Sequence, residues 1–275
     1  MTVLRPVITL TSDFGLADPY VGSMKGVILS LNPDVLIVDI SHEVRPQCIE
    51  QGAFLLAAAW PYFPPGSIHV AVVDPGVGTE RRAIALVTES GTFLGPDNGL
   101  LSVALPEDAR QAAGDSTRMA PLPGRARGFL LADARFHRRP VSATFHGRDI
   151  FASVAAHLSL GIPAADLGPE VREIITLPPF RAHSRPDGSL EGRVIHVDRF
   201  GNLITTVRRD QLGAQQIVVE LAGRRVSGLV QTYAQAQGLA ALVGSAGYME
   251  IALAGGSAAQ ELRADVGATL IVRTL

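Results

Sequence analysis

The first half of the chain alternates short apolar runs with longer helix-like stretches. The pattern predicts strands at 7–10, 35–40 and 67–73 and helices at 20–31 and 49–60. This β-α-β-α-β order favours a parallel sheet covered by helices. Strands in such a sheet are buried on both faces, and these three accordingly read as continuous apolar runs.

The rhythm changes in the second half. Residues 106–140 are irregular, 150–160 predict a helix, and the segment 177–180 (Leu-Pro-Pro-Phe) cannot continue a helix and predicts a linker. Strand-like runs separated by turns then follow at 192–197, 216–221, 247–253 and 269–274. We therefore predict an α/β protein with an N-terminal α/β domain at 1–176, built on a largely parallel sheet, and a smaller antiparallel domain at 177–275.

Composition narrows the class of protein. Of 275 residues, 47% are hydrophobic and 18% are charged, which is the balance of a globular protein. The net charge of −2 gives no electrostatic reason to bind nucleic acid or a membrane surface. The N-terminus lacks a signal-peptide layout, and the longest apolar run, 53–60, is far shorter than the roughly 20 residues that cross a bilayer. With Cys48 as the single cysteine, we expect a soluble cytoplasmic protein without internal disulfides.

Loops of unusual composition follow these predicted strands, at 11–15 and 74–78, and another comes later, at 95–99. In open α/β sheets, ligands bind beyond the carboxyl ends of the strands. Asp13 and Asp74 each come just after a predicted strand, so we expect both carboxylates at the same rim of the sheet.

The loop Asp74-Pro75-Gly76-Val77-Gly78 is followed closely by Arg81. Its proline and two glycines favour a tight turn, across which the Asp74 carboxylate and the Arg81 guanidinium could face each other. A structural turn with a surface ion pair is the alternative. The loop is not a phosphate-binding P-loop, because the required Lys-Ser/Thr is missing.

Other polar residues permit two interpretations each. His146, in Phe-His-Gly-Arg-Asp, is catalytic or structural, and Asp149 could simply favour the start of the helix. Asp13 is either a turn residue or helix cap, or a carboxylate that binds the two vicinal hydroxyls of a ribose. The histidines show no metal-site spacing, so we expect no metal.

The segment Asp198-Arg199-Phe200-Gly201-Asn202 has a purely structural interpretation, as a turn at the end of a strand. It also combines a carboxylate, an aromatic face and an amide, a set that suits an amine and a nucleobase. Taken one by one, these motifs lead only to an α/β protein with a polar site at the rim of its sheet.

Taken together and in order, the motifs resemble the S-adenosyl-L-methionine (SAM) hydrolase family, also called SAM hydroxide adenosyltransferases, which is related to the fluorinases and chlorinases. The resemblance runs nearly end to end. The blocks that carry it are 11–15, Tyr20-Val21-Gly22, Lys25-Gly26, 38–42, 73–79 with Arg81, 96–99, 144–149, 198–202 and 248–252.

The resemblance implies an N-terminal α/β domain, a C-terminal β-barrel-like domain and a homotrimer with SAM sites between subunits. SAM is then the substrate, and no cofactor is implied. The implied roles are these: Asp74, Arg81 and His146 handle the water, Asp13 binds the ribose hydroxyls, Asp198 the methionine ammonium, Phe200 and Asn202 the adenine, and Ser245, where the match is looser, the methionine carboxylate.

Departures from the halogenases favour hydrolysis. Where a fluorinase has a tyrosine, a serine and a tryptophan, this chain has Asp74, Gly147 and Gln47. A carboxylate at the nucleophile site would repel a halide and accept a proton or hydrogen bond from water. The products would be adenosine and L-methionine. A SAM-dependent chlorinase and a non-catalytic SAM or adenosine sensor are the alternatives.

Overall fold

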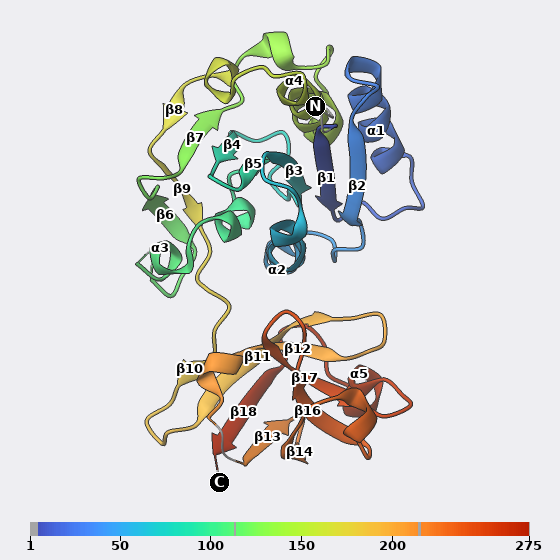
Figure 1. Cartoon of the computed structure of the whole chain (residues 1–275), viewed down its shortest axis with the longest axis vertical. Helices are drawn as coiled ribbons and strands as arrows, with labels where there is room; N and C mark the ends of the chain where they lie inside the picture. The colour runs from blue at the N-terminus through green and yellow to red at the C-terminus, as the bar shows by residue number, and fades with distance from the viewer. Residues whose placement is uncertain (1–4, 113, 214–215, 275) are drawn as a thin grey trace. The chain divides into compact units, whose positions relative to one another are not determined.

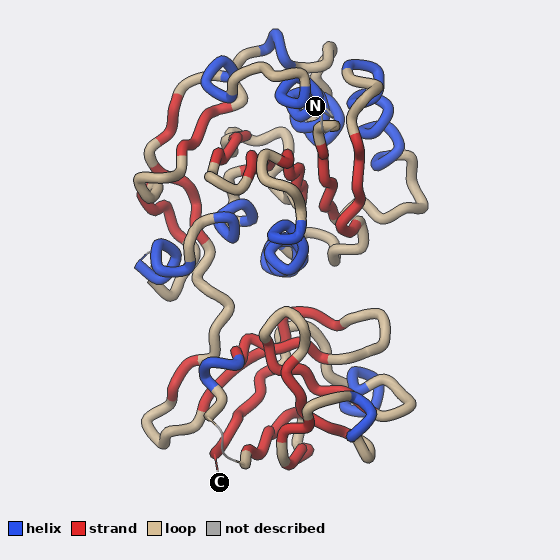
Figure 2. The backbone as a smooth tube through the Cα atoms, viewed as in Figure 1, coloured by secondary structure: helices blue, strands red, loops and turns tan. Residues whose placement is uncertain are grey.

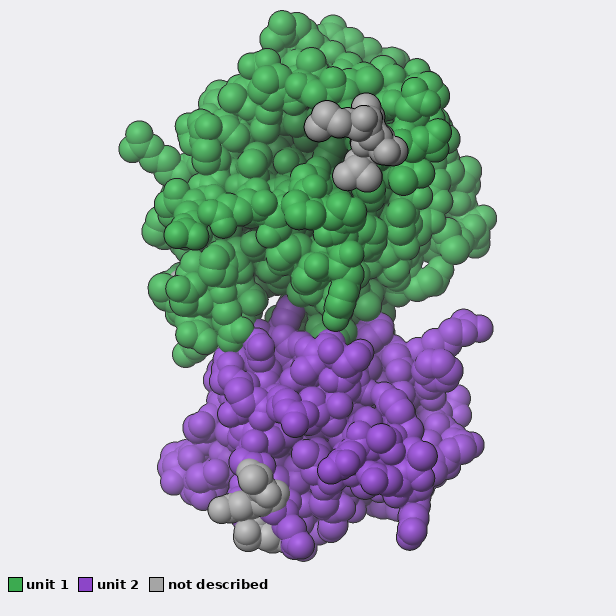
Figure 3. Space-filling model, in the orientation of Figure 1, with its two compact units in different colours: residues 1–179 green, residues 180–275 purple. Residues whose placement is uncertain are grey.

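The computed structural model describes residues 5–112, 114–213 and 216–274. The chain forms two compact units, Met1–Pro179 and Phe180–Leu275 (Figure 3). The division falls inside the Leu-Pro-Pro-Phe segment that the sequence predicts as a linker, three residues after the predicted boundary. None of the helices among the described residues is long and apolar enough to cross a membrane.

The first unit is built on a seven-stranded sheet (Figures 1 and 2). Its strand order is β2-β1-β3-β5-β4-β7-β8; the pairs from β2 to β5 are parallel, and the later pairs are antiparallel. The strands are β1 (Val7–Ser12), β2 (Leu36–Ser41), β3 (Ser67–Val72), β4 (Ala83–Val87), β5 (Gly91–Pro96), β7 (Arg127–Leu130) and β8 (Glu170–Val171). The predicted parallel-rich α/β fold of this unit is confirmed.

The remaining elements of the first unit surround this sheet. A separate pair joins β6 (Arg118–Pro121) to β9 (Glu173–Thr176), inside and after the region that the sequence predicted as irregular. The helices are α1 (Tyr20–Leu31), α2 (Ile49–Ala59), α3 (Glu107–Ala112) and α4 (Ser153–Ser159), with a π-helical turn, η4 (Gly147–Ala152), just before α4 and 3₁₀ turns at Trp60–Tyr62, Leu100–Ala104, Ala134–Phe136 and Ala164–Leu167.

The two faces of the sheet carry different side chains, because successive residues of a strand point to opposite sides. Ile8 and Leu10 of β1 belong to the core cluster that includes Met24 and Ile28 of α1. Thr9, between Ile8 and Leu10, points to the other face and contacts His69 of β3.

One strand departs from the prediction of burial on both faces. β3 is buried at every position, but β2 is the edge strand, and its Leu36 and Val38 are 44% and 38% exposed. An apolar run therefore did not distinguish an edge strand from a central one.

The helix predicted at 150–160 also differs from the prediction, because its first part lies in the π-helical turn η4.

The second unit is a nearly closed, barrel-like sheet that is mostly antiparallel. Its order is β14-β13-β18-β11-β12-β17-β16-β15, and β14 comes close to β16 across the end of this order. The strands are β10 (His183–Ser184), which pairs with β11 (Leu190–Val197), then β12 (Leu203–Arg208), β13 (Ile217–Leu221), β14 (Arg224–Ser227), β15 (Leu229–Val230), β16 (Leu239–Val243), β17 (Tyr248–Leu253) and β18 (Thr269–Thr274), with the short helix α5 (Ala258–Leu262) and 3₁₀ turns at Arg209–Gln211 and Tyr233–Gln235. The predicted antiparallel domain is confirmed.

His69 is a buried histidine in the first unit and sets part of its pH stability. Its ring stacks on Phe93 with centroids 4.7 Å apart, and its Nδ1 lies 2.8 Å from the Thr9 hydroxyl. Burial lowers the pKa of His69 to about 4. In the unfolded chain His69 is therefore protonated below about pH 6.5, whereas in the folded chain it is protonated only below about pH 4.

We predict that protonation of His69 in the unfolded chain lowers the free energy of unfolding by roughly 3 kcal/mol as the pH drops from 6.5 to 4. The stabilisation is fully present above pH 6.5. Denaturant titrations across this pH range measure it, and the double variant Thr9→Val/His69→Phe, which keeps the stack and removes the titrating group, should show a shallower loss. An equal slope in both proteins would contradict this assignment.

Candidate active site

A cavity of about 360 Å³ lies in the first unit, beyond the carboxyl ends of β1 and β3. Asp13 follows β1, and Asp74 comes two residues after β3. Both line the cavity, so the prediction that they share one rim is confirmed. The other lining residues are Phe14, Tyr20, Pro46, Gln47, Val72, Pro75, Val77, Thr144, Phe145, His146 and Gly147.

The loop after β3 is folded tightly against the segment that leads to His146. Gly78 has φ +78°, and a Cβ on it would lie 2.4 Å from the Ala143 carbonyl oxygen. Only glycine fits both the backbone conformation and this close approach. Turn hydrogen bonds from Val77 N–H to the Asp74 carbonyl and from Thr79 N–H to the Gly76 carbonyl reverse the chain. The reversal returns Arg81 to Asp74.

Arg81 connects the other two members of the triad that the resemblance implies, Asp74 and His146. Its Nε donates to both Asp74 oxygens at 2.9 and 3.0 Å, and its Nη2 donates to Asp74 Oδ2 at 2.5 Å. The same Nη2 lies 2.7 Å from His146 Nδ1. The Asp74 and Arg81 side chains are only 5% and 12% exposed, so this is a largely buried pair rather than a surface ion pair.

The contact with Arg81 fixes the proton positions on His146. A guanidinium has donors and no acceptor, so the Nδ1 of His146 must accept, and the neutral ring carries its hydrogen on Nε2. Burial lowers the pKa of His146 below its ordinary value, and the Arg81 charge lowers it further. The environment therefore keeps the imidazole neutral.

His146 is held in place by the π-helical turn that follows it. Such π-helical turns are frequent at functional sites. Asp149, inside the turn, is fully buried and accepts hydrogen bonds from Arg148, from Arg138 and from the Ser142 N–H. Burial raises the pKa of Asp149, but these donors outweigh it and the pKa is lowered. Asp149 thus ties the segment before His146 to the turn after it.

Asp13 accepts a backbone hydrogen bond at the cavity. Its Oδ2 accepts the Gln47 N–H at 2.8 Å, and Gln47 adopts the left-handed conformation with φ +65°, which side chains rarely adopt. Burial raises the pKa of Asp13, its backbone hydrogen bonds lower it, and the Asp74 carboxylate raises it again. Two carboxylates therefore share the cavity, one bound to a guanidinium and one to a backbone N–H.

Three aromatic residues form a wall of the cavity that the sequence analysis missed. Phe14, Tyr20 and Phe145 meet pairwise with ring centroids 5.2 to 5.9 Å apart. They also line an adjoining cavity of about 330 Å³ with Arg148, whose guanidinium lies over the Phe145 ring. All three rings fall within matching motifs, and that position was the available signal. Gly147 faces this wall, and a Cβ there would lie 3.1 Å from the Phe14 ring.

The third polar loop, 95–99, is not among the residues that line the cavity. Asp97 is buried, forms an ion pair with Arg82 and accepts the Ile175 N–H at 2.8 Å. Asn98 donates to the Val73 carbonyl. This loop braces the sheet.

The other predicted residues lie in the second unit. Asp198, Phe200 and Asn202 form one turn between β11 and β12, in which Asp198 accepts the N–H groups of Phe200 and Asn202 and the Asn202 side-chain amide. Phe200 is 78% exposed, whereas Asn202 is buried. Ser245 is exposed in the turn between β16 and β17.

A buried carboxylate, Glu250 of β17, adds a polar group to the second unit that had no role in the sequence analysis. It accepts the Tyr233 hydroxyl at 2.6 Å. Burial raises the pKa of Glu250, and Asp198 adds to the rise. The pKa of Tyr233 is also raised, first by burial and then by its hydrogen bond to Glu250. The charge coupling indicates that this pair and Asp198 are near each other.

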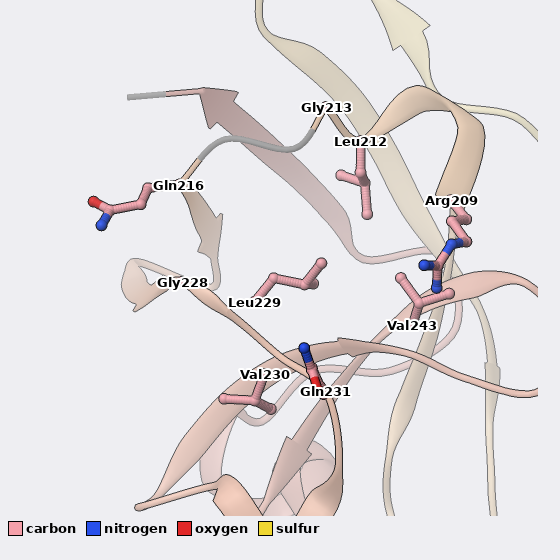
Figure 4. A pocket seen from close by; sticks show the side chains of 9 residues that line it. All are labelled: Arg209, Leu212, Gly213, Gln216, Gly228, Leu229, Val230, Gln231 and Val243. Carbon is pink, nitrogen blue, oxygen red and sulfur yellow. The ribbon is translucent and has the colours of Figure 1, made fainter.

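A larger cavity, of about 870 Å³, lies elsewhere in the second unit (Figure 4). Its lining includes the aliphatic side chains of Leu212, Leu229, Val230 and Val243 together with Arg209. None of the predicted site residues lines it. Across the described part of the chain, no three His, Cys, Asp or Glu side chains form a group that could hold a metal ion.

Comparison with known proteins matches the sequence of the chain to one family. Sequence models of the SAM hydroxide adenosyltransferase N-terminal and C-terminal domains match residues 8–168 and 192–271. The chain is 43% identical to an (R)-S-adenosyl-L-methionine hydrolase of Thermus thermophilus over 94% of this chain and 96% of that one. A hydrolase of the same name from Salinispora arenicola is 40% identical over 97% of both chains.

A more distant relative and a solved structure are also similar to this chain. A fluorinase of Actinopolyspora mzabensis is 28% identical over 76% of this chain and 73% of its own. The fold matches a crystal structure of an uncharacterized conserved protein from Thermotoga maritima with a TM-score of 0.83, 31% identity and coverage of 97% and 99% of the two chains. Matches to both domains and identities of 40% or more over nearly the whole chain show that this protein belongs to the SAM hydroxide adenosyltransferase family.

Proposed function

We propose that the protein hydrolyses SAM to adenosine and L-methionine, with water attacking C5′ in line with the departing sulfur. The observation that carries the proposal is the Arg81 guanidinium that holds Asp74 and His146 together at a cavity of about 360 Å³. Relatives at 40% and 43% identity bear the name of this activity.

The cavity suits a substrate with a positive centre. Asp13 and Asp74 line it, and the sulfonium of SAM is a cation that such carboxylates attract. Asp13 keeps one oxygen outside its hydrogen bond to Gln47, so it retains acceptors for the ribose hydroxyls. In the second unit we assign Asp198 to the methionine ammonium, Phe200 and Asn202 to the adenine, and Ser245 to the methionine carboxylate.

The chemistry requires a better nucleophile rather than a better leaving group. Methionine departs as a neutral thioether when the C5′–S bond breaks, so no general acid is needed. Water has a pKa of about 15.7 and is a poor nucleophile. Holding it in line behind C5′ is worth roughly 7–11 kcal/mol of the barrier.

The hydrogen bonds around Arg81 favour Asp74 as the acceptor of the proton. The Nδ1 lone pair of His146 already accepts from Arg81, and the other nitrogen carries hydrogen. The carboxylate of Asp74 keeps acceptor capacity beyond its bonds to Arg81. As the oxygen forms its bond to C5′, Asp74 takes the proton, and Arg81 stabilises the developing hydroxide.

The alternatives fit the site less well. A halide at the position of the water would face the Asp74 carboxylate, which repels it. The position at which a fluorinase has a serine is Gly147, packed against Phe14. A sensor that only binds SAM would have no use for a buried, paired carboxylate and a neutral imidazole at one wall, so hydrolysis is favoured over both.

The triad gives the first test of this function. We predict that Asp74→Asn and His146→Ala lower the rate of adenosine formation roughly 10²- to 10⁴-fold, because the first removes the proton acceptor and the second removes the side chain that holds Arg81 from the other side. SAM binding should change much less, because Asp13 and the residues assigned in the second unit retain their contacts. Chromatography of the products and calorimetric titration with SAM measure the two quantities. Glu80→Gln, an exposed carboxylate in the same loop, is the control. Wild-type turnover in both triad variants would refute the roles assigned to them.

The proposal includes a homotrimer with each site shared between neighbouring subunits, and a cytoplasmic location. The resemblance to the family supports the first, and the single Cys48 supports the second. The triad belongs to the first compact unit and the Asp198 turn to the second, so the proposed substrate contacts are drawn from both units.

Mixing two inactive variants tests the shared site. Asp74→Asn is defective in the first unit and Asp198→Asn in the second. We predict that trimers assembled from equal amounts of both by co-expression recover about one quarter of the wild-type activity, since that share of sites combines two intact halves. Their mass in solution should be three times the 29.0 kDa of the chain. A mixture as inactive as its parents would place each site within one chain.

A further inference from the structure

A chain of polar side chains leads from the surface to Ser12, the residue before Asp13 of the cavity. Lys25 Nζ lies 2.5 Å from Asp39 Oδ2, and the other oxygen of Asp39 lies 3.2 Å from His42 Nε2. His42 Nδ1 lies 2.7 Å from the Ser12 hydroxyl. Ser12 and His42 are buried, and Ser12 directly precedes Asp13 of the cavity.

The orientation of this chain follows from its charged end. The Asp39 carboxylate favours the hydrogen of the imidazole on Nε2, although that contact is an ion-pair approach rather than a well-aligned hydrogen bond. Nδ1 then accepts, and the Ser12 hydroxyl donates to it. The oxygen of the same hydroxyl accepts the Phe14 N–H at 3.3 Å. His42 therefore fixes the hydroxyl that in turn holds the backbone of Phe14.

The main chain of His42 holds the other end of the same turn. Its carbonyl accepts the Gly15 N–H at 2.8 Å. The Ser12 carbonyl in turn accepts the Val44 N–H at 3.4 Å. Both ends of the turn are thus tied to residues 42–44, and the two residues between them are Asp13 and Phe14, which line the cavity.

We infer that His42, oriented by Asp39 and Lys25, is a positioning residue that sets Asp13 and Phe14 for substrate binding. The inference rests on the proposed function, because Asp13 is assigned there to the ribose. His42 itself is not among the residues that line the cavity, so its effect passes through Ser12 and the turn. It should act on the binding of the nucleoside and leave the triad, carried by other loops, unchanged.

The fold offers a matched control on the same strand. Thr9 and His69 form a second buried hydroxyl–imidazole pair at 2.8 Å. Thr9 is three residues before Ser12 in β1, and neither Thr9 nor His69 lines the cavity. Thr9→Val and Ser12→Ala each remove one hydroxyl from such a pair, so they share the cost to stability and differ in their connection to the site.

The experiment compares Ser12→Ala, His42→Ala and Asp39→Asn with Thr9→Val. For each we measure KM and kcat for SAM, adenosine affinity by calorimetry and the thermal midpoint. We expect Ser12→Ala and His42→Ala to raise KM and the adenosine Kd roughly three- to tenfold, the effect of about one hydrogen bond, with kcat within a factor of about two. Asp39→Asn, at a partly exposed residue, should give a smaller shift in the same direction.

Thr9→Val should lower the thermal midpoint and leave KM and the adenosine Kd at their wild-type values. The double variant Ser12→Ala/His42→Ala should be no weaker in binding than the worse single variant, because the two residues act in one chain. Unchanged binding in folded Ser12→Ala and Asp39→Asn, or an equal change in Thr9→Val, would overturn the inference.

Failure of the proposed function is separable from failure of this inference. If the wild-type protein binds adenosine but releases none from SAM, the function is wrong, and the adenosine affinities of the variants still decide the role of His42. A wild-type protein that binds neither SAM nor adenosine overturns both.

Discussion

One guanidinium organises the candidate active site. Arg81 is buried with Asp74 on one side and His146 on the other, and it supplies donors to both. A buried carboxylate beside a cavity would be costly without this partner, and a histidine facing a donor-only group is held in one neutral tautomer. Two local features bring the three groups together. The tight glycine turn packed on Ala143 returns Arg81 to Asp74, and the π-helical turn anchored by Asp149 follows His146 directly.

The supports of the site follow one physical rule, that a buried polar group needs a partner. Asp149 binds two arginines and a backbone N–H, and Asp13 binds the Gln47 N–H at a strained backbone position. Asp97, with similar burial and an arginine partner, braces the sheet instead. Burial and pairing alone therefore do not distinguish a carboxylate of the cavity from a structural one; Asp13 and Asp74 line the cavity and Asp97 does not.

The sequence predicted the parts that depend on local pattern. The helix at 20–31 and the strand at 269–274 have the predicted bounds, and the alternation of elements predicted the parallel-rich sheet. Apolar runs could not reveal that β2 is an edge strand, because pairing partners are set by tertiary structure. The Asp74–Arg81 contact was predicted across a turn, but the bridge to His146, 65 residues farther on, entered only through family resemblance. The aromatic wall and the Ser12–His42 contact likewise depend on how distant segments pack.

The central claim is that water, directed by Asp74 and Arg81, replaces the sulfur at C5′ of SAM. Incubating the purified protein with SAM in ¹⁸O-labelled water, with chloride in excess, and analysing the products by mass spectrometry tests it most directly. The account predicts adenosine labelled at its 5′ oxygen, unlabelled methionine, and no chlorinated nucleoside. Adenosine without the label, 5′-chloro-5′-deoxyadenosine as the main product, or unconsumed SAM would contradict it.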